Sequence, residues 1–416
     1  MKYPRLRADL DALAQCGRDA AGGHNRPAFS AADIEGRRWL QRQMTAVGLD
    51  VRIDAAANVI GRLASNAGGN ELPALMIGSH TDTVPNGGAL DGALGVLAGL
   101  EVARRLQDEA RPRLRPLEIV SFEDEEGRFS AFTGSRSMLE GIEPSKLEQM
   151  RDADGTQLDQ AAKAVGFPIN GFPAAKREKQ SIAAYLELHI EQGSVLERKR
   201  LAVGIVDAIV GQGRFSIRFE GRADHAGSTP MTERKDAFAA AALFATNLRE
   251  VVIAKGEGRA VMTIGVVKVE PGAGNVVPAR ARLALEIRDT DKARLEALIA
   301  ATETEAQRAA ALHGVTASCR QTYRIDPTPM DVTLRGELER AARDVGLDYL
   351  VMSSAAGHDA QIVGRHVPAG MIFVPSIGGR SHCPEEATEW SDIERGVDLL
   401  YETAARLLAD REKLAH

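Results

Sequence analysis

Cysteine is scarce in this chain of 416 residues, which contains Cys16, Cys319 and Cys383 and no other. Three scattered thiols are too few for a disulfide framework or for a zinc site built from cysteine alone. We therefore expect plain reduced thiols.

An excess of positive charge and a long apolar run are also absent. Lysine and arginine number 52 against 58 acidic residues, which gives a net charge of −6 and no basic block. This balance argues against a nucleic-acid-binding protein. No stretch approaches 18 uninterrupted apolar residues, so we predict no membrane span. The segment Met1–Asp9 lacks the apolar run of a signal peptide, which predicts a cytoplasmic location.

The length and composition are those of a globular protein with more than one domain. Single cores rarely grow beyond about 250–300 residues, so a chain of 416 residues is expected to form two domains. Apolar residues make up 44% and charged residues 26%, which is ordinary for a globular chain.

The first half of the chain alternates between helical and buried-strand patterns. Continuous apolar runs bounded by turn residues predict strands that are buried on both faces, as in a parallel sheet. Ser30 is a candidate N-cap for the first long helix. This rhythm predicts an α/β fold, with helices over 31–47 and 92–106 and strands over 73–78, 117–122 and 183–190.

The pattern changes near Gly211. The following segments predict the order β-α-β-β-α-β, which is the ferredoxin-like unit, with strands over 214–219, 260–269, 281–288 and 315–322 and helices over 236–250 and 292–312. After Asp326 a helix (334–345) and a buried strand (371–374) return. We therefore predict a large α/β domain formed by residues 1–211 and 327–416, with residues 212–326 inserted as a smaller α+β domain.

Most chemically capable side chains lie at or just after the predicted strands of the large domain. In open α/β sheets, the crevice beyond the carboxyl ends of the strands is where ligands bind. A mixed set of imidazoles and carboxylates suits Zn²⁺, Mn²⁺, Co²⁺ or Ni²⁺. The four strand ends contribute His80 and Asp82, then Glu123 to Glu126, then Glu187, His189 and Glu191, and finally His382, and Asp91 follows eleven residues after His80.

The spacing within these clusters suggests distinct roles. A metal-bound imidazole usually donates its other N–H to a carboxylate, which His80-x-Asp82 would allow. The adjacent Glu125 and Glu126 could divide the work, one binding metal and the other moving protons. Together these groups predict amide hydrolysis by metal-activated water, without a side-chain nucleophile.

Each residue also has a structural interpretation. The acidic run from Glu123 to Glu126 could be a solvated loop, and Asp91 could be a helix N-cap. A single histidine is more often a surface or core residue than a ligand. Their co-occurrence at four strand ends favours a site over surface decoration.

Several blocks resemble the metallopeptidase M20 superfamily. More narrowly, they are similar to its hydantoinase/carbamoylase branch, which includes N-carbamoyl-L-amino-acid hydrolases, β-ureidopropionases and allantoate amidohydrolases. The blocks occur in the expected order over nearly the whole chain: 78–92, 124–129, 187–193, 224–231, 357–360 and 375–382. The loop 22–27 departs from the Gly-Gly-Val-Thr-Arg form of many carbamoylases, and this weakens any inference about which ureido compound fits.

The resemblance implies a large di-metal α/β catalytic domain, with a mixed sheet flanked by helices, and an inserted ferredoxin-like lid and dimerisation domain. It also implies two divalent metal ions per subunit, Zn²⁺ or else Mn²⁺, Co²⁺ or Ni²⁺. The expected partners are a small N-carbamoyl amino acid or related ureido substrate and a second copy of the chain.

The resemblance also assigns roles at the metal centre. His80 and His189 would bind one ion, Glu126 and His382 the other, and Asp91 would bridge them. Many M20 peptidases have a carboxylate in place of His189, so this histidine favours the carbamoylase branch. Glu125 would be the general base and acid, and Asp82 would orient His80.

The inserted domain would supply substrate contacts. His225 would reach a neighbouring active site across a dimer and polarise the scissile carbonyl. Asn275 and Arg288 would hold the substrate's carboxylate, with Gln192 and the backbone near Gly379. His358 and Asp359 would hold supporting positions near the site.

These three residues of the inserted domain have structural alternatives. His225 could be a turn residue, because Gly227 and Pro230 follow it. Asn275 could have a purely conformational role in its Gly/Pro-rich turn. Arg288 could form a salt bridge with Asp289 or Asp291.

The implied reaction is hydrolysis of N-carbamoyl-L-amino acids to the amino acid, ammonia and CO₂. Rivals within the branch are allantoate or ureidoglycolate hydrolysis and β-ureidopropionase activity, and a more distant rival is an M20 peptidase or deacylase. A nucleotide-binding oxidoreductase is disfavoured, because residues 87–95 lack Gly-x-Gly-x-x-Gly and Asp91 would repel a pyrophosphate. A non-catalytic binding protein is disfavoured because every expected position is filled.

Overall fold

The computed structural model describes residues 2–410, which form two compact units. The first unit contains the chain up to Asp207 and from Met330 onward, and the second is Ala208–Pro329. The inserted segment expected from the sequence, 212–326, lies inside the limits of the second unit.

The first unit is built on a mixed sheet. β3 pairs in parallel with β4 and β5, and β5 pairs in parallel with β13, whereas β1, β2 and β6 pair with their neighbours in antiparallel fashion. The order is β1-β2-β4-β3-β5-β13-β6-β11, with β12 also paired to β6. The mixed α/β sheet predicted from the sequence is confirmed. The strands of this sheet are β1 (Asp50–Ile53), β2 (Val59–Leu63), β3 (Ala74–His80), β4 (Leu117–Phe122), β5 (Ile182–Ile190), β6 (Val203–Ile209), β11 (Thr328–Pro329), β12 (Tyr349–Ser354) and β13 (Ala369–Val374). β11 and the last two residues of β6 fall within the limits of the second unit.

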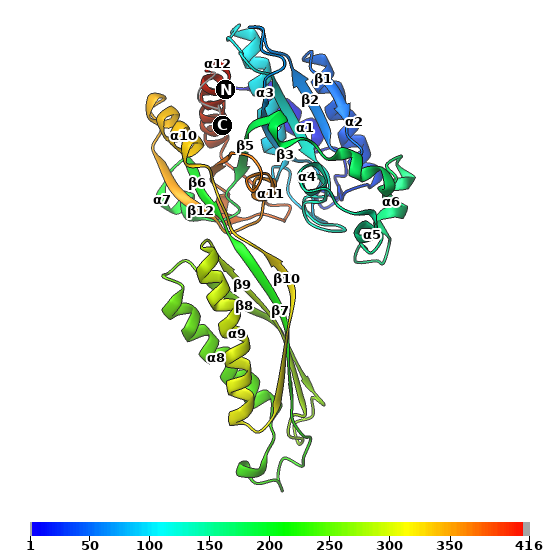
Figure 1. Ribbon diagram of the computed structural model, residues 1–416, viewed down its shortest axis with the longest axis vertical. Helices are drawn as coiled ribbons and strands as arrows, with labels where there is room; N and C mark the ends of the chain where they lie inside the picture. The colour runs from blue at the N-terminus through cyan, green and yellow to red at the C-terminus, as the bar shows by residue number, and fades with distance from the viewer. Residues whose placement is uncertain (1, 411–416) are drawn as a thin grey trace. The chain divides into compact units, whose positions relative to one another are not determined.

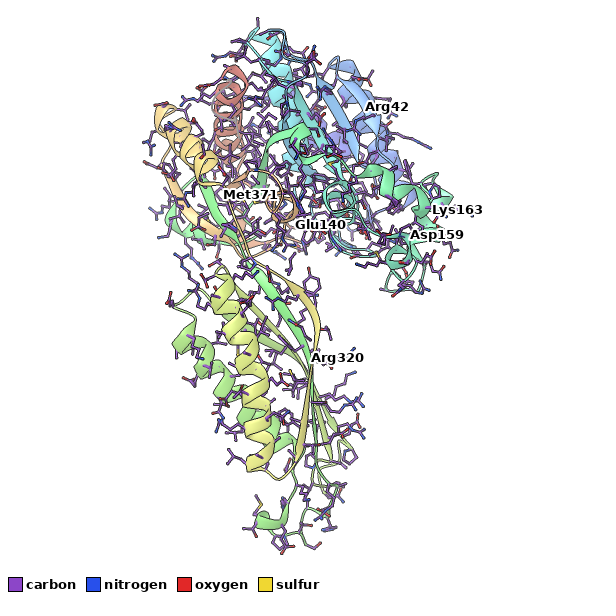
Figure 2. The ribbon with its side chains drawn as sticks, viewed as in Figure 1. Arg42, Glu140, Asp159, Lys163, Arg320 and Met371 are labelled. Atoms are coloured by element: carbon purple, nitrogen blue, oxygen red, sulfur yellow. The ribbon has the colours of Figure 1, made fainter. Side chains whose placement is uncertain are left out.

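Helices flank this sheet and share its core (Figure 1). β3, β4, β5 and β13 are buried along their whole length, which explains why apolar residues dominate both faces of these strands instead of one face. The helices of this core are α1 (Pro4–Leu13), α2 (Ala31–Ala46), α3 (Ala93–Asp108), α10 (Val332–Asp344) and α12 (Trp390–Ala409). In Figure 2, Met371 of β13 lies inside the unit, and Arg42 and Lys163 lie at its surface.

Shorter helices complete the first unit. α5 and α6 pack with neighbouring loops around a second, smaller core. The predicted N-cap of α2 is confirmed, since the Ser30 hydroxyl accepts a hydrogen bond from the Asp33 amide at 3.1 Å. The short helices are α4 (Thr133–Leu139), α5 (Pro144–Leu147), α6 (Leu158–Ala164), α7 (Val195–Lys199) and α11 (Asp359–Val363).

Arg26 ties the amino-terminal segment to the sheet. Its side chain is buried, and its guanidinium donates hydrogen bonds to the main-chain oxygens of Thr81 (2.6 Å), Cys16 (2.8 Å) and Leu13 (3.1 Å). The end of α1 and the residue after β3 are therefore held by one cation.

The second unit has the predicted β-α-β-β-α-β order. Its sheet, in the order β10-β7-β9-β8, is antiparallel throughout, and two helices cover one face (Figure 1). The alternating burial along β7 and β9 follows from this one-sided cover. The elements are β7 (Gly211–Glu220), α8 (Ala237–Lys255), β8 (Val261–Glu270), β9 (Arg280–Asp289), α9 (Lys292–Leu312) and β10 (Thr316–Ile325).

Among the described residues, α8 is the helix whose length and composition would allow it to cross a membrane. Polar residues such as Asn247 and Arg249 interrupt its apolar sequence. Phe244, Leu248 and Val252 are buried in the core of the second unit. This packing is that of a core helix in a two-layer α+β unit.

Candidate metal centre

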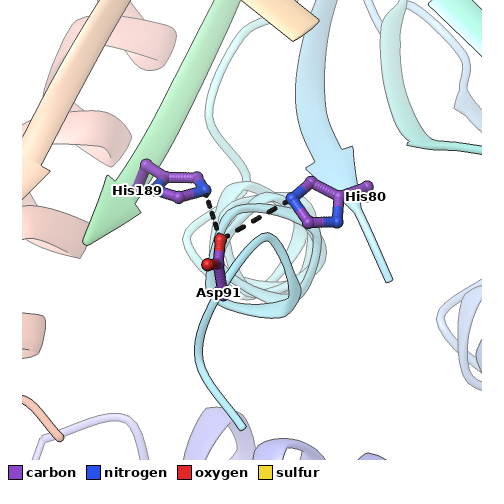
Figure 3. Close-up of side chains that lie close together, drawn as sticks. All are labelled: His80, Asp91 and His189. Atoms are coloured by element: carbon purple, nitrogen blue, oxygen red, sulfur yellow. Dashed lines mark ion pairs between the residues drawn. The ribbon is translucent and has the colours of Figure 1, made fainter. Parts of the chain in front are cut away.

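Asp91 lies among three imidazoles in the first unit. Its Oδ1 atom is 3.0 Å from His189 Nε2 and 3.7 Å from His80 Nε2 (Figure 3). Its Oδ2 atom is 3.1 Å from His382 Nε2. One carboxylate thus faces donor atoms on both of its oxygens, as a bridging ligand does.

Neighbouring strands bring these residues together. His80 is the last residue of β3 and His189 the second-last of β5, and these strands run parallel side by side. Asp91 lies in the loop that leads into α3 (Figure 3). Gly92 follows it at φ +63°, and a Cβ there would lie 2.4 Å from the His80 ring. Only glycine lets the loop pass this ring.

The predicted N-cap alternative for Asp91 is not seen. α3 begins without a side-chain cap. The Asp91 carboxylate instead accepts hydrogen bonds from Gln192 Nε2 (2.8 Å) and Ser381 Oγ (3.0 Å).

Two glutamates complete the cluster. Glu126 Oε1 is 3.5 Å from His382 Nε2, and Glu125 Oε2 is 3.5 Å from His80 Nε2. The groups His80–Asp91–His189, Asp91–Glu126–His382 and His80–Glu125–Glu126 each place their ligand atoms within 4.8 Å of one another. The five predicted metal ligands and the predicted base therefore lie together in one unit.

The charges of this site are unbalanced in favour of the carboxylates. Burial and the nearby charge of Asp91 raise the pKa of Glu126 to about 8. Burial also raises the pKa of Glu125 well above its usual range, and the neighbouring His80 only partly opposes this. The hydrogen bond with Asp91 raises the pKa of His382 to about 9. Buried acids that keep their protons indicate missing positive charge.

These residues fit divalent metal ions. Nitrogen and oxygen ligands bind at about 2.0–2.2 Å from zinc, so ligands of one ion lie about 3–4 Å from each other. The distances from Asp91 and Glu126 to the three imidazoles fall within this range. The two groups that share Asp91 could hold two adjacent ions.

Asp82 lies beside His80, as predicted, but its main-chain oxygen is closer to the imidazole than its carboxylate is. His80 Nδ1 lies 3.0 Å from the main-chain oxygen of Asp82 and 3.5 Å from its carboxylate. The carboxylate accepts hydrogen bonds from the amides of Glu125 (3.3 Å) and Glu126 (3.2 Å). The backbone of Asp82 thus orients His80, and its side chain holds the turn that carries both glutamates.

His189 is oriented in the same way. Its Nδ1 atom lies 2.8 Å from the main-chain oxygen of Ile190. A proton on Nδ1 of His80 and of His189, assigned from these carbonyl partners, leaves each Nε2 lone pair free for a metal.

His358 lies directly behind His189. The two rings are 4.5 Å apart and nearly perpendicular, and His358 Nε2 is 2.9 Å from Ser354 Oγ. Burial lowers the pKa of His358 well below its usual value, so it stays neutral. Glu187, which forms a fourth group of possible ligand atoms with these histidines, already accepts hydrogen bonds from Ser79, Tyr185 and Ala360. These contacts fit a supporting position for His358.

Asp359 is also buried next to this region. Burial and the nearby Glu187 raise the pKa of its carboxyl well above the usual range. It begins α11, one residue after His358, and is absent from the groups of ligand atoms found in residues 2–410.

Gln192 lies in a loop of the first unit, and Gly379 ends a short 3₁₀ helix of the same unit, Ile377–Gly379. The Gln192 amide donates to Asp91, as given above, and lies 3.5 Å from His382 Nε2. Gly379 packs against the backbone of Ser194. Gln192 therefore lies at the metal centre itself.

A cavity of about 620 Å³ opens beside Asp82 and Glu126. Pro27, at the end of the loop that departs from the carbamoylase form, lines this cavity with Phe29 and Arg128. The unusual loop therefore borders open space next to the metal centre.

The remaining predicted residues belong to the second unit. His225 is adjacent to the loop of Asn275, whose main-chain oxygen accepts a hydrogen bond from the Ala226 amide at 3.0 Å. His225 Nδ1 accepts from the amides of Gly227 (3.1 Å) and Ser228 (3.2 Å). The ring proton is therefore assigned to Nε2, which is left as a donor.

Arg288 forms an ion pair with Glu286, which was not among the partners considered from the sequence, Asp289 and Asp291. Its Nε donates to Glu286 Oε1 at 2.6 Å, whereas the buried Asp289 binds Arg294 at 2.7 Å. The alternative of a salt bridge with Asp289 is not borne out, because successive residues of β9 point to opposite faces and Glu286 shares the face of Arg288.

Sequence reasoning missed two residues at the centre, Ser381 and Glu386. The Ser381 hydroxyl reaches both the Asp91 carboxylate and Glu386. Glu386 accepts hydrogen bonds from the amides of Leu90 and Asp91. The sequence signal that could have indicated Glu386 is its position four residues after the predicted ligand His382.

Comparisons with known proteins agree with this geometry. The model of Peptidase family M20/M25/M40 matches residues 76–406. The chain is 35% identical to an N-carbamoyl-L-amino-acid amidohydrolase of Paenarthrobacter aurescens, over 91% of this chain and 92% of that protein. It is 37% identical to an allantoate amidohydrolase of Escherichia coli, over 95% of each.

A solved structure gives the same result. The amidase of the hydantoinase/carbamoylase family from Burkholderia phymatum matches with a TM-score of 0.87 and 38% identity over 97% of each chain. This chain therefore belongs to peptidase family M20/M25/M40 and, within it, to the hydantoinase/carbamoylase branch.

Proposed function

We propose that this protein is a metal-dependent amidohydrolase that removes the carbamoyl group of N-carbamoyl-L-amino acids. The products are the free amino acid, ammonia and CO₂. The observation that carries this proposal is the cluster of His80, His189, His382 and Glu126 around Asp91, buried except at the half-exposed His382, with Glu125 beside it, in a chain of the carbamoylase branch.

The cluster would hold two divalent ions, Zn²⁺ or else Mn²⁺, Co²⁺ or Ni²⁺. When bound, such ions polarise a carbonyl and lower the pKa of water. His80 and His189 would hold one ion, Glu126 and His382 the other, and Asp91 would be shared between them. The distances from Asp91 to three imidazole nitrogens support this division.

Glu125 moves the protons. Its carboxylate takes a proton from the attacking water and returns it to the leaving nitrogen. The position of Glu125 supports this role, because its carboxylate is buried and lies 3.5 Å from Nε2 of His80, outside the proposed ligand set. Asp82 supports Glu125 by fixing its main chain.

The second unit supplies substrate contacts. Arg288 and Asn275 hold the substrate's carboxylate, with Gln192 and the backbone at Gly379. His225 donates from Nε2 to the scissile carbonyl of a neighbouring copy in a homodimer formed through this unit. The amides bound to His225 Nδ1 support this donor form. The homodimer and a cytoplasmic location stay predictions.

A second candidate is hydrolysis of allantoate or ureidoglycolate. The allantoate amidohydrolase relative is as similar to this chain as the carbamoylase relative. The altered loop that ends at Pro27 and borders the cavity also leaves room for a different ureido compound. β-Ureidopropionase activity is a further rival, and peptidase or deacylase activity a more distant one.

One assay panel tests these alternatives. Apo protein and protein supplied with each metal are offered N-carbamoyl α-amino acids, N-carbamoyl-β-alanine and allantoate, and ammonia release is measured. Metal-dependent turnover of the carbamoyl α-amino acids supports the proposal. Hydrolysis of dipeptides or acetyl amino acids without any carbamoyl turnover would overturn it.

The role of Arg288 gives a separate prediction. A lysine cannot make the two parallel hydrogen bonds that a guanidinium makes with a carboxylate. Arg288→Lys should raise KM about 10–100-fold, because one hydrogen bond to a charged group contributes about 1.5–3 kcal/mol. Steady-state kinetics of ammonia release measure this.

Arg282→Lys is the matched control. Arg282 is on the same face of β9 and pairs with Glu270. Equal KM values for the two variants and the unmodified protein would show that Arg288 does not hold the substrate.

A further inference from the structure

Glu386 is a buried carboxylate beside the metal centre that is not among the proposed ligands. Its side chain comes from the loop after β13, and it is 8% exposed. Glu386 Oε1 accepts hydrogen bonds from the main-chain amides of Leu90 (2.9 Å) and Asp91 (3.0 Å). Glu386 thus holds the main chain of Asp91, the residue shared by the groups His80–Asp91–His189 and Asp91–Glu126–His382.

Glu386 also reaches the side chain of Asp91 through Ser381. The Ser381 hydroxyl lies 2.9 Å from Glu386 Oε2 and 3.0 Å from Asp91 Oδ2. Glu386 is therefore connected to both the amide and the carboxylate of Asp91, and these two connections fix the position and rotation of that side chain.

The surrounding loop leaves space for this carboxylate. A Cβ at Gly88 would lie 2.1 Å from Glu386 Oε1. Any side chain at residue 88 would displace Glu386 and break its hydrogen bonds with the amides of Leu90 and Asp91. The loop 88–91 and Glu386 thus pack closely against each other.

Glu386 Oε1 accepts two main-chain hydrogen bonds, and Glu386 Oε2 shares the single hydroxyl proton of Ser381 with Asp91 Oδ2. The placement of Glu386 next to Asp91 brings two acids together, which costs electrostatic energy. Partners that orient metal ligands typically change metal affinity about 10–100-fold when they are removed.

We propose that Glu386, acting through Ser381 and the amides of Leu90 and Asp91, is a positioning residue that holds Asp91 where it can bind two ions. This inference rests on the proposed function for the presence of metal. It adds a residue that metal binding would require although it is not a ligand. This residue is almost 300 positions away from Asp91 in the chain.

Three variants test the proposal. Glu386→Met keeps the length of the side chain and removes both acceptors. Glu386→Gln keeps one oxygen for the two amides and an NH₂ group that can donate to Ser381. Glu385→Met is the matched control, because Glu385 is the neighbouring residue, is 59% exposed and pairs with Arg380.

The measurement is Zn²⁺ affinity of the metal-free protein, by competition with a chromogenic chelator, without substrate. We expect Glu386→Met to lose about 10–100-fold in affinity. Glu386→Gln should stay within a few-fold of the unmodified protein, and Glu385→Met should equal it. Thermal unfolding of the metal-free variants is followed in parallel.

The outcomes separate this inference from the proposed function. If the unmodified protein binds no Zn²⁺, the proposed function fails and this inference fails with it. If it binds Zn²⁺ and Glu386→Met binds equally well, only the positioning role is overturned. A lower unfolding temperature with unchanged affinity would likewise overturn it, since that is a purely structural role. If Glu386→Met does not fold, Ser381→Ala decides, and unchanged affinity in that variant overturns the proposal.

Discussion

Replacing Glu125 with glutamine is expected to lower kcat about 10²–10⁴-fold and to leave the metal content unchanged. Glutamine has the size of glutamate but cannot accept a proton from water. Glu125 is buried beside His80 and outside the proposed ligand set, so the amide should fit without displacing an ion. Kinetics of ammonia release and elemental analysis of the purified protein measure the two quantities.

Glu385→Gln is the control for this variant, because the same change is made on an exposed residue of the same unit. Turnover by Glu125→Gln within tenfold of the unmodified protein would remove Glu125 from the mechanism. Loss of metal in that variant would make Glu125 a ligand rather than a base.

Replacing Asp91 with asparagine should have an effect at least as large. A bridging ligand uses both carboxylate oxygens, and asparagine offers one neutral oxygen in their place. We expect the metal content to fall by at least one ion per subunit. Activity should fall by more than the roughly 100-fold that loss of an outer partner costs.

This substitution also separates the two interpretations of Asp91. Asparagine and aspartate are about equally good N-caps, so a capping role predicts a nearly unchanged protein. Metal titration of the metal-free variant and thermal unfolding would distinguish them. Full metal content with normal activity would contradict the bridging role.

The elements that position the site could be predicted because their signals are local. β3, β4, β5 and β13 are rich in apolar residues, and chemically capable polar residues lie at or just after their carboxyl ends. Parallel strands end at the same edge of a sheet, so the chemistry at their ends could be placed together before any coordinates.

Relations between distant segments could not be predicted in this way. Glu386 meets Asp91 only after β13 has paired with β5, and nothing near either residue in the sequence specifies that meeting. The order of the sheet and the antiparallel pair β1–β2 are likewise products of long-range packing. The long helix α12 was not predicted, although its strongly one-sided apolar face is a local signal.

Two local interpretations were only partly correct, for geometric reasons. His80 and Asp82 are close, but the main-chain oxygen is the nearer partner, because the carboxylate is drawn to the two amides of the next turn. Arg288 forms an ion pair, but with the residue two positions away on its strand rather than with its neighbour.

The buried guanidinium of Arg26 makes the amino-terminal helix part of the catalytic scaffold. Two of its three carbonyl partners precede residue 17, and the third directly follows His80, a proposed metal ligand. A shortened protein that begins after residue 16 would leave this buried cation with one of its three carbonyl partners, Thr81. Expression designs, fusions and circular permutants of this enzyme should therefore keep residues 4–16 attached at their native position.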